Sequence, residues 1–173
     1  MFEALETKRL RLKNIGYDDA DFFYREFSTE AVNAFLYDAE PLCSVEEARE
    51  WIGFYLQEGA CDRHRWIIVL KDTGERIGTC GFHCWNRETG TVEMGYDLQP
   101  AYWRQGYITE AIGEIIRYAK QKMNVRSIAA HIAEGNIASI KTVMRLGFYR
   151  TDETYLQRFH GQEHLHFIYR LDL

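Results

Sequence analysis

Prolines, cysteine pairs and long apolar runs are scarce in this chain of 173 residues. It contains only two prolines, and its 46% apolar content argues against a disordered chain. No C-x-x-C sequence occurs, and Cys80 and Cys84 lie four positions apart in an expected strand. That spacing places them about 13 Å apart on one face, which is too far for a disulfide. We therefore expect reduced, structural cysteines in a cytoplasmic protein.

The chain also lacks a long hydrophobic stretch and an excess of positive charge. Its longest apolar runs, such as Trp66–Leu70, are too short to cross a bilayer. Charged residues interrupt Met1–Leu12, so we expect no signal peptide. The formal net charge is −5, which argues against nucleic acid or an anionic membrane as the main partner and suits a cationic one.

What is present is the pattern of one mixed α/β domain over residues 1–173. Apolar periodicity and turn residues predict strands at 6–15, 65–71, 75–85, 90–98 and 126–134, a closing hairpin of 148–159 with 163–173, and helices at 17–27, 44–59, 109–123 and 136–147. Ser44 is expected to cap the second helix, which should end at Gly59. No linker or internal repeat divides this order of elements.

The segment QPAYWRQGYITEA, residues 99–111, joins a strand to a helix and carries the first indication of a ligand. A helix N-terminus presents unpaired N–H groups and the positive end of a dipole, so it is a natural anion site. Gly106 lets the backbone approach a ligand without a Cβ, Arg104 adds charge, and Thr109 can cap the helix or donate to a phosphate. Because no Lys-Ser/Thr pair ends the segment, it is not a nucleoside triphosphate P-loop. Taken alone, it is explained equally well as a tight strand-to-helix turn.

The segment NIASIKTVMRLGF, residues 136–148, carries the second indication. Asn136 is a good N-cap, and Gly147 is a natural helix end. Taken alone, this segment is simply a short helix with suitable ends. The two segments lie about thirty residues apart with a buried strand between them.

At that spacing, VEMGYDLQPAYWRQGYITEA followed by NIASIKTVMRLGF resembles the acetyl-coenzyme A motifs of the GNAT N-acetyltransferase superfamily. The likeness is closest to its RimJ/RimL-type branch, which acetylates ribosomal-protein N-termini and small amines. It spans nearly the whole chain and is strongest over residues 75–148. The resemblance implies a single acyl-CoA N-acyltransferase domain with a central, mostly antiparallel, splayed sheet flanked by helices on both faces.

The same resemblance implies where acetyl-CoA binds, with no metal. The pyrophosphate would lie on amides of residues 103–108, although Trp103 stands where the family has Gln or Arg, and Ile108 where it has Gly or Ala. The pantetheine would pair with exposed backbone near Leu98 and with Asn136. Lys141 and Arg145 would screen phosphates, or would equally be ordinary helix-surface cations. The implied cosubstrate-binding residues are Leu98, Arg104, Gln105, Gly106, Tyr107, Ile108, Thr109, Asn136, Ser139, Lys141 and Arg145.

Acetyl transfer to an amine requires a base, a donor for the tetrahedral oxyanion and an acid for the leaving thiolate. We expect Glu93 to be the base, with Asp97 as a weaker substitute, and the amide of Gly95 or Tyr96, after a strand bulge, to polarise the carbonyl. Many relatives use a Tyr as the acid where this chain has Val143. RimL-like relatives use a Ser, which corresponds to Ser139. That serine could equally bond its own backbone.

The acceptor pocket is the least defined part of the site. Its candidate lining residues are Phe35, Tyr37, Asp38, His83, Trp85 and Tyr155, although aromatic residues in strands are more often core. His160, His164 and His166 could bind a metal, but a polar hairpin face explains them better. No G-x-S-x-G motif supports a serine hydrolase. A non-catalytic acyl-CoA sensor is the main alternative; the choice between a protein N-terminus and a small amine, and a possible homodimer, stay open.

Overall fold

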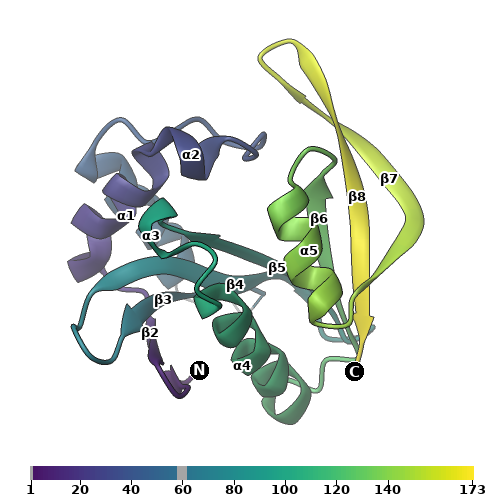
Figure 1. Cartoon of the computed structure of the whole chain (residues 1–173), viewed down its shortest axis with the longest axis horizontal. Coiled ribbons are helices and arrows are strands. Elements are labelled where there is room, and N and C mark those ends of the chain that lie inside the picture. Colours follow the sequence, from purple (N-terminus) through teal and green to yellow (C-terminus); the bar gives the residue numbers. More distant parts are fainter. Residues whose placement is uncertain (1, 58–61) are drawn as a thin grey trace.

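The computed structural model describes residues 2–57 and 62–173, and it forms one layered α/β domain (Figure 1). The expected helix end at Gly59 lies outside the described residues. Eight strands occur in the described part of the chain: β1 (Leu5–Glu6), β2 (Leu10–Asn14), β3 (His64–Leu70), β4 (Arg76–Asn86), β5 (Thr91–Leu98), β6 (Ser127–Ala133), β7 (Tyr149–Phe159) and β8 (Gln162–Asp172). The helices are α1 (Ala20–Ser28), α2 (Glu30–Asn33), α3 (Val45–Leu56), α4 (Tyr107–Lys122) and α5 (Ile137–Arg145).

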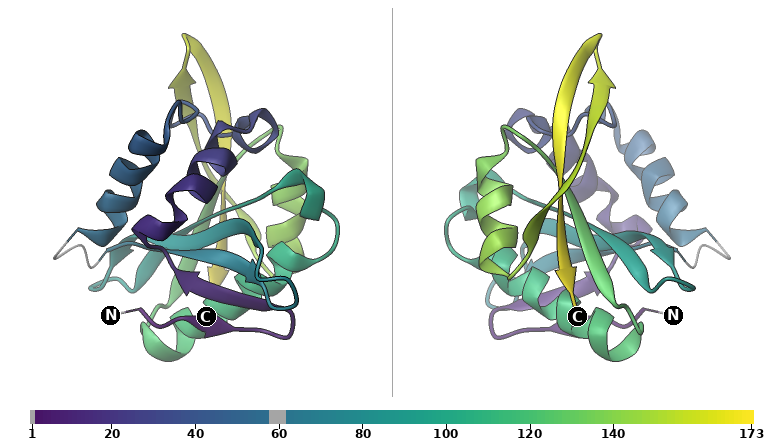
Figure 2. Two further views of the ribbon diagram at one scale, coloured as in Figure 1. Left: turned by 90° about the vertical axis from the view of Figure 1, so that its left-hand side faces the viewer. Right: turned by 90° about the vertical axis from the view of Figure 1, so that its right-hand side faces the viewer.

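The strands form one sheet in the order β1-β2-β3-β4-β5-β6-β8-β7. All neighbouring strands are antiparallel except β5 and β6, which run parallel. That pair is joined over only three residue pairs, from Thr91↔Ser127 to Glu93↔Ala129. Beyond Glu93 the two strands separate, and the β7–β8 hairpin stands steeply against β3–β5 (Figures 1 and 2). The expected splayed, mostly antiparallel sheet is therefore confirmed.

Helices cover both faces of the sheet because its central strands alternate apolar side chains between two cores. In β3, Trp66 and Ile68 pack with α4 and α5 in the larger core. Ile67, between them, packs with α1 and α3 in the smaller one. Figure 2 shows these two helix pairs on opposite sides of the strands. None of the described helices is long and apolar enough to span a membrane.

The expected elements and the observed ones differ in three places. The first strand is split into β1 and β2, and a short helix, α2, was not predicted. Helix α4 begins at Tyr107, two residues before the expected start, because Gly106 adopts a left-handed φ of 80° and serves as the N-cap. Thr109 is therefore inside the first turn and is not the cap.

The pairing of β4 with β5 breaks between His83 and Asn86, where Cys84 takes a φ of 53°. This irregularity turns the residues after it, so Cys80 is buried while Cys84 is exposed. The expectation that Cys80 and Cys84 share one strand face was wrong, since strict alternation ends at the bulge. The expected bulge in β5 is also absent: Glu93–Leu98 pairs without interruption with β4.

Candidate active site

The turn before α4 presents a series of free backbone amides. Arg104 and Gly106 both have positive φ values, 60° and 80°, which curl the chain just before the helix. Within the described residues, no backbone or side-chain acceptor takes a hydrogen bond from the amides of residues 104–109. These amides and the helix dipole together form a cradle for an anion.

The side chains of Trp103 and Ile108 fix the backbone of this turn. The indole Nε1 of Trp103 donates to the carbonyl oxygen of Leu98 at 2.6 Å and so fixes the turn to the end of β5. Ile108 packs on the larger core, so its side chain does not fill the cradle despite its bulk. The turn therefore leaves its main-chain donors open to an anionic ligand.

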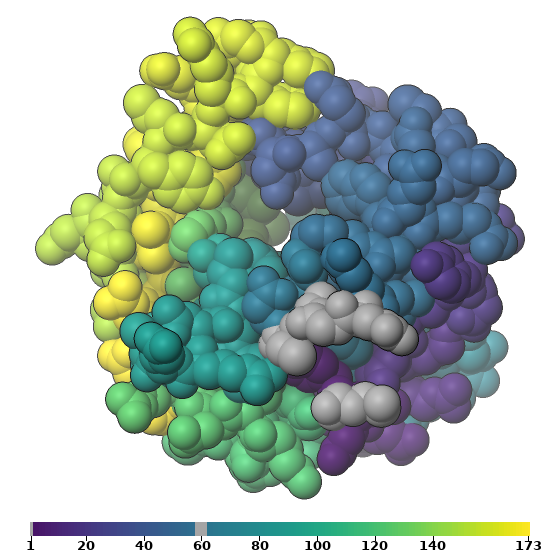
Figure 3. Space-filling view, turned by 180° about the vertical axis from the view of Figure 1, so that it is seen from behind, coloured from purple at the N-terminus to yellow at the C-terminus, as the bar shows by residue number. Residues whose placement is uncertain are grey.

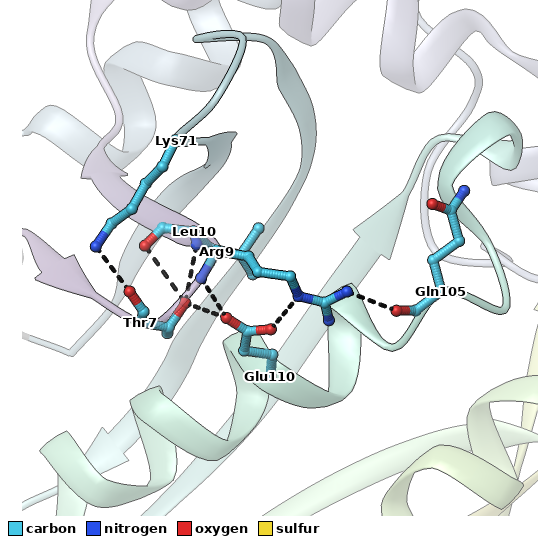
Figure 4. Close-up of polar contacts among 6 residues, drawn as sticks. All are labelled: Thr7, Arg9, Leu10, Lys71, Gln105 and Glu110. Carbon is cyan, nitrogen blue, oxygen red and sulfur yellow. Dashed lines mark hydrogen bonds and ion pairs between the residues drawn. The ribbon is translucent and has the colours of Figure 1, made fainter.

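The N-terminal segment fixes the start of α4 from the other side (Figure 4). Glu110, in the first helical turn, accepts hydrogen bonds from the Arg9 amide at 2.8 Å, the Arg9 Nε at 2.7 Å and the Thr7 hydroxyl at 2.5 Å. The Arg9 Nη1 also donates to the carbonyl of Gln105 at 3.0 Å, and its guanidinium lies 4.3 Å from the centre of the Tyr107 ring. This cluster was not predictable from the sequence, because its members lie about a hundred positions apart.

Helix α5 begins as expected, with Asn136 as its cap. The Asn136 Oδ1 accepts a hydrogen bond from the Ser139 amide at 3.1 Å. The Ser139 hydroxyl lies 2.6 Å from the phenol oxygen of Tyr96 on β5. Lys141 and Arg145 are exposed on the same helix, and neither forms an ion pair among the described residues.

Glu93 lies at the fork where β5 and β6 separate. Its Oε2 is 3.2 Å from Nε2 of His83 on β4 and 3.8 Å from Nδ1 of His131 on β6. The three side chains remain partly exposed, at 31%, 43% and 29% respectively. The hydrogen bond from His83 lowers the pKa of Glu93, whereas burial lowers the pKa of His131. At neutral pH the cluster therefore holds an ionised carboxylate beside a neutral imidazole.

Asp97 lies on the same face of β5, but its carboxylate is fully engaged. Oδ2 accepts from Arg65 Nη1 at 3.0 Å and from the Thr79 hydroxyl, and Oδ1 accepts from the Thr79 amide at 3.0 Å. Burial raises the pKa of Asp97 although Arg65 opposes the shift. Because its side chain is buried and both oxygens already have partners, Asp97 is less accessible to a substrate proton than Glu93.

A cavity of about 330 Å³ opens beside this cluster, between α1, α3 and β4. Its walls are aromatic, from Phe27, Trp51, Phe54 and Tyr55, and His83 lines its end toward Glu93. The acidic residues Asp38, Glu40 and Asp62 also line it. The space-filling view shows the surface hollowed between the N-terminal helices and the β7–β8 hairpin (Figure 3). Of the expected pocket residues, Asp38 and His83 lie at this cavity.

The other expected pocket residues are placed differently. Tyr155 stacks on His166 with ring centres 4.9 Å apart and lies 5.6 Å from His131, so it faces the fork. Tyr37 stacks on His164 at 3.6 Å. Phe35 lies against Gly135, at the turn that precedes α5.

Trp85, another expected pocket residue, is not among the residues that line this cavity. Its ring packs against Phe2 in the larger core, with ring centres 6.3 Å apart. The bulge at Cys84 is the physical reason, because it rotates Trp85 away from the face that His83 occupies.

The hairpin histidines are held by other partners. His160 pairs with Glu40 at 2.5 Å, while His164 and His166 form the ring contacts with Tyr37 and Tyr155. No group of three or more metal-ligating side chains occurs in residues 2–57 and 62–173.

Comparison with known proteins accounts for this arrangement. The model of the acetyltransferase (GNAT) domain matches residues 9–149. The N-acetyltransferase p20 of Bacillus licheniformis, itself uncharacterized, is 34% identical over 149 residues, which cover 84% of this chain and 82% of p20. The uncharacterized N-acetyltransferase YoaA of Bacillus subtilis is 33% identical over 152 residues, covering 86% and 84%.

The fold is shared with solved acetyltransferases. RimL, a ribosomal L7/L12 alpha-N-protein acetyltransferase in complex with coenzyme A, superposes with a TM-score of 0.85 at 17% identity, covering 99% of this chain and 98% of RimL. The spermidine N-acetyltransferase of Vibrio cholerae, in complex with CoA and spermine, gives 0.84 at 17% identity and 96% coverage of both chains. By its sequence and its fold, the chain belongs to the GNAT family, as an acetyl-CoA-dependent acetyltransferase.

Proposed function

We propose that this protein transfers acetyl from acetyl-CoA to a primary amine by direct attack in a ternary complex, as a RimJ/RimL-type N-acetyltransferase. The observation that carries the proposal is the position of Glu93. It lies where β5 and β6 separate, and its partner His83 lines the aromatic cavity. A thioester held in the fork and an amine held in the cavity would meet beside that carboxylate.

The cosubstrate is proposed to bind through main-chain donors more than through side chains. The amides of residues 104–109, which have no internal acceptors, would receive the pyrophosphate, with Arg104, Lys141 and Arg145 adding positive charge. Pantetheine would follow the backbone of β5 beyond Glu93, which β6 leaves unpaired, and reach the amide group of Asn136. The carbonyl of Leu98 already accepts from Trp103, so Leu98 contributes contact rather than that acceptor.

The base is proposed to be Glu93 together with its imidazole neighbours. An ammonium group must lose a proton before its nitrogen can attack, and a primary amine on an alkyl chain titrates near 10. The ionised Glu93 attracts that ammonium. Its carboxylate accepts the proton and shares it with the imidazoles of His83 and His131 beside it. A lone carboxylate whose pKa is lowered would be a weaker base, because it holds a proton less well.

The remaining two requirements fall on β5 and α5. As the nitrogen bonds to the carbonyl carbon, a free amide of β5 near Gly95 or Tyr96 donates to the oxyanion. When the carbon–sulfur bond breaks, the Ser139 hydroxyl donates to the departing sulfur. The amine loses two protons overall: the first leaves to solvent through the exposed side of the histidine cluster, and the second, released from the nitrogen as the tetrahedral intermediate collapses, restores the Ser139 hydroxyl. The products are the acetamide and coenzyme A.

The acceptor is proposed to be a small cationic amine with an apolar body. Aromatic walls suit the body and the charge, and Asp38 adds a carboxylate, whereas Glu40 and Asp62 are paired with His160 and Arg63. The cavity of about 330 Å³ matches the lower end of small-molecule sites. The structurally similar proteins include both a spermidine and a ribosomal-protein acetyltransferase, so a protein N-terminus is the competing acceptor.

Release of free thiol from acetyl-CoA in the presence of an amine panel tests the function. The panel should contain polyamines, arylalkylamines, amino acids, aminoglycosides and N-terminal peptides. Acetylation of an arylalkylamine or polyamine, identified by mass spectrometry of the product, supports the proposal. Acetylation of N-terminal peptides alone would overturn the small-amine assignment. Tight acetyl-CoA binding with no thiol release from any amine would favour the non-catalytic sensor instead.

A further inference from the structure

Tyr96 and Ser139 are joined by the shortest polar contact between β5 and helix α5. The phenol oxygen lies 2.6 Å from the Ser139 Oγ and 3.3 Å from the Ser139 carbonyl oxygen. Tyr96 comes from the strand beyond the fork, and Ser139 from the helix that follows β6. The bond therefore crosses between the two diverging parts of the sheet, next to the path proposed for the pantetheine.

A serine hydroxyl acts as an acid only when its hydrogen points at the leaving atom. Ser139 has one such hydrogen, and Tyr96 is the only hydrogen-bond partner of its Oγ among the described residues. If Ser139 donated to Tyr96, its hydrogen would point away from the thioester. If Tyr96 donates to Ser139, the serine hydrogen is free for the sulfur.

We propose that Tyr96 is a positioning residue, which donates its phenol hydrogen to the Ser139 Oγ and so directs the Ser139 hydrogen toward the departing sulfur of coenzyme A. This inference rests on the proposed function and deepens it, since it names the residue through which the acid is oriented. No proton leaves Tyr96: the phenol keeps its O–H bond while its hydrogen bond to Ser139 strengthens.

The surroundings of Tyr96 suit that role. Its ring packs against the larger core, which fixes where the hydroxyl lies. Burial raises the pKa of Tyr96 to about 12, so the phenol stays a donor over the whole working pH range. As negative charge grows on the sulfur and draws on the Ser139 hydrogen, the serine oxygen becomes a better acceptor, and the two hydrogen bonds strengthen each other.

A double-mutant cycle tests the inference. Tyr96→Phe removes only the hydroxyl, and Ser139→Ala removes the proposed acid. We expect Tyr96→Phe to lower kcat about tenfold with the KM for acetyl-CoA within twofold of wild type. In the Ser139→Ala background the same substitution should leave kcat within twofold, because the group that Tyr96 orients is gone.

Tyr118→Phe is the matched control. Tyr118 is buried in the same core, and its phenol forms no hydrogen bond with any residue that the structure describes, so kcat should not change. Thermal unfolding of each variant separates loss of fold from loss of rate.

The outcomes distinguish this inference from the function on which it rests. Two results would overturn the inference and leave the acetyltransferase assignment intact. In the first, Ser139→Ala lowers kcat but Tyr96→Phe does not. In the second, Tyr96→Phe lowers kcat by the same factor in the wild-type and the Ser139→Ala backgrounds. Normal kinetics of Ser139→Ala would remove the acid and the inference together. Absence of thiol release by the wild-type protein with every amine would overturn the proposed function itself.

Discussion

His83 and His131 approach the same carboxylate oxygen, Oε2 of Glu93, from strands on opposite sides of the fork, at 3.2 Å and 3.8 Å. The first imidazole belongs to β4 and the second to β6, which pair with β5 on its two edges. The cluster therefore exists only when the sheet is assembled with its parallel pair in register. This dependence links the fold directly to the proposed base.

Replacing Glu93 by Gln should lower kcat/KM at pH 7 about a hundredfold, because the ammonium loses its charged neighbour and the imidazoles lose their partner. The His83 hydrogen bond lowers the pKa of Glu93, so the wild-type carboxylate stays ionised down to low pH. The acid limb of the pH–rate profile should therefore follow His131, whose pKa burial lowers, in the wild type. Thiol release measured from pH 5 to pH 9 gives the comparison.

Glu114→Gln is the control for this substitution. Glu114 pairs with Arg117 on α4, away from the fork, so its loss should leave the profile unchanged. A Glu93→Gln variant with the wild-type rate and profile would show that the base lies elsewhere.

Asn136 is expected to have two separable roles, as helix cap and as pantetheine contact. Its Oδ1 accepts from the Ser139 amide, and an aspartate can accept in the same way. Asn136→Asp should therefore keep the stability of the protein but weaken acetyl-CoA binding, since it lacks the amide donor and adds a negative charge.

Asn136→Ala should lose both the helix cap and the pantetheine contact, and its free energy of unfolding should fall by about 1 kcal/mol. Calorimetric binding and chemical denaturation measure the two effects. If Asn136→Asp binds acetyl-CoA as tightly as the wild type, the side-chain amide does not contact the cosubstrate.

Gly106, the N-cap of α4, and Gly113, inside the helix, give a matched pair of glycines for testing the cradle. A Cβ at Gly106 would meet nothing closer than the Arg9 Nη2 at 3.5 Å, but the residue has a φ of +80°. Gly106→Ala should therefore cost about 1 kcal/mol of stability through backbone strain and weaken acetyl-CoA binding as the amides shift.

A Cβ at Gly113 meets no atom within 4 Å. Gly113→Ala should stabilise the helix by about 0.5–1 kcal/mol and leave binding unchanged. Equal acetyl-CoA affinity for Gly106→Ala and the wild type would count against the cradle.

Glu26 should make the protein less stable at neutral pH than at mildly acidic pH. Its side chain is fully buried, and burial, reinforced by the charge of Asp97, raises the pKa of Glu26 to about 10. A raised pKa in the folded state contributes stability below the ordinary glutamate value near 4.5. That contribution is lost as the pH rises from there toward 10, because only the unfolded chain ionises.

Glu26→Gln should therefore raise the free energy of unfolding relative to the wild type more at pH 8 than at pH 5, as denaturation at both values would measure. Glu50→Gln, at an exposed position of α3, controls for the loss of one acidic side chain. An equal difference at both pH values would contradict the assignment of Glu26 as a buried neutral acid.

Local patterns were sufficient to predict most of the fold. Apolar stripes and caps located α3, α4 and α5 to within a few residues, since the spacing of apolar residues in an amphipathic helix indicates its buried face. The bulge at Cys84 was not predictable, because alternation in β4 continues through it. For that reason the sequence placed Trp85 beside His83, whereas the strand turns Trp85 into the core.

The candidate site was predicted where it depends on short motifs and missed where it depends on long-range contacts. Asn136 and Ser139 lie within one recognisable segment, and the turn at Gly106 lies within another. His131 was missed because it lies in a strand whose sequence indicates only burial. Tyr96 and Arg9 were missed as partners of Ser139 and Glu110, since nothing in one linear sequence pairs residues so far apart.

Only three residue pairs join β5 to β6, so two unequal parts of the sheet are connected by a short stretch of strand pairing. An extended ligand arm that lies along the unpaired edges of β5 and β6 would act as an added strand and extend this connection. Occupancy would then stiffen the whole molecule, and mass action would make resistance to heat rise with ligand concentration. The short pairing of β5 with β6 thus predicts that the cosubstrate, by bridging the two parts of the sheet, contributes to their cohesion as well as to catalysis.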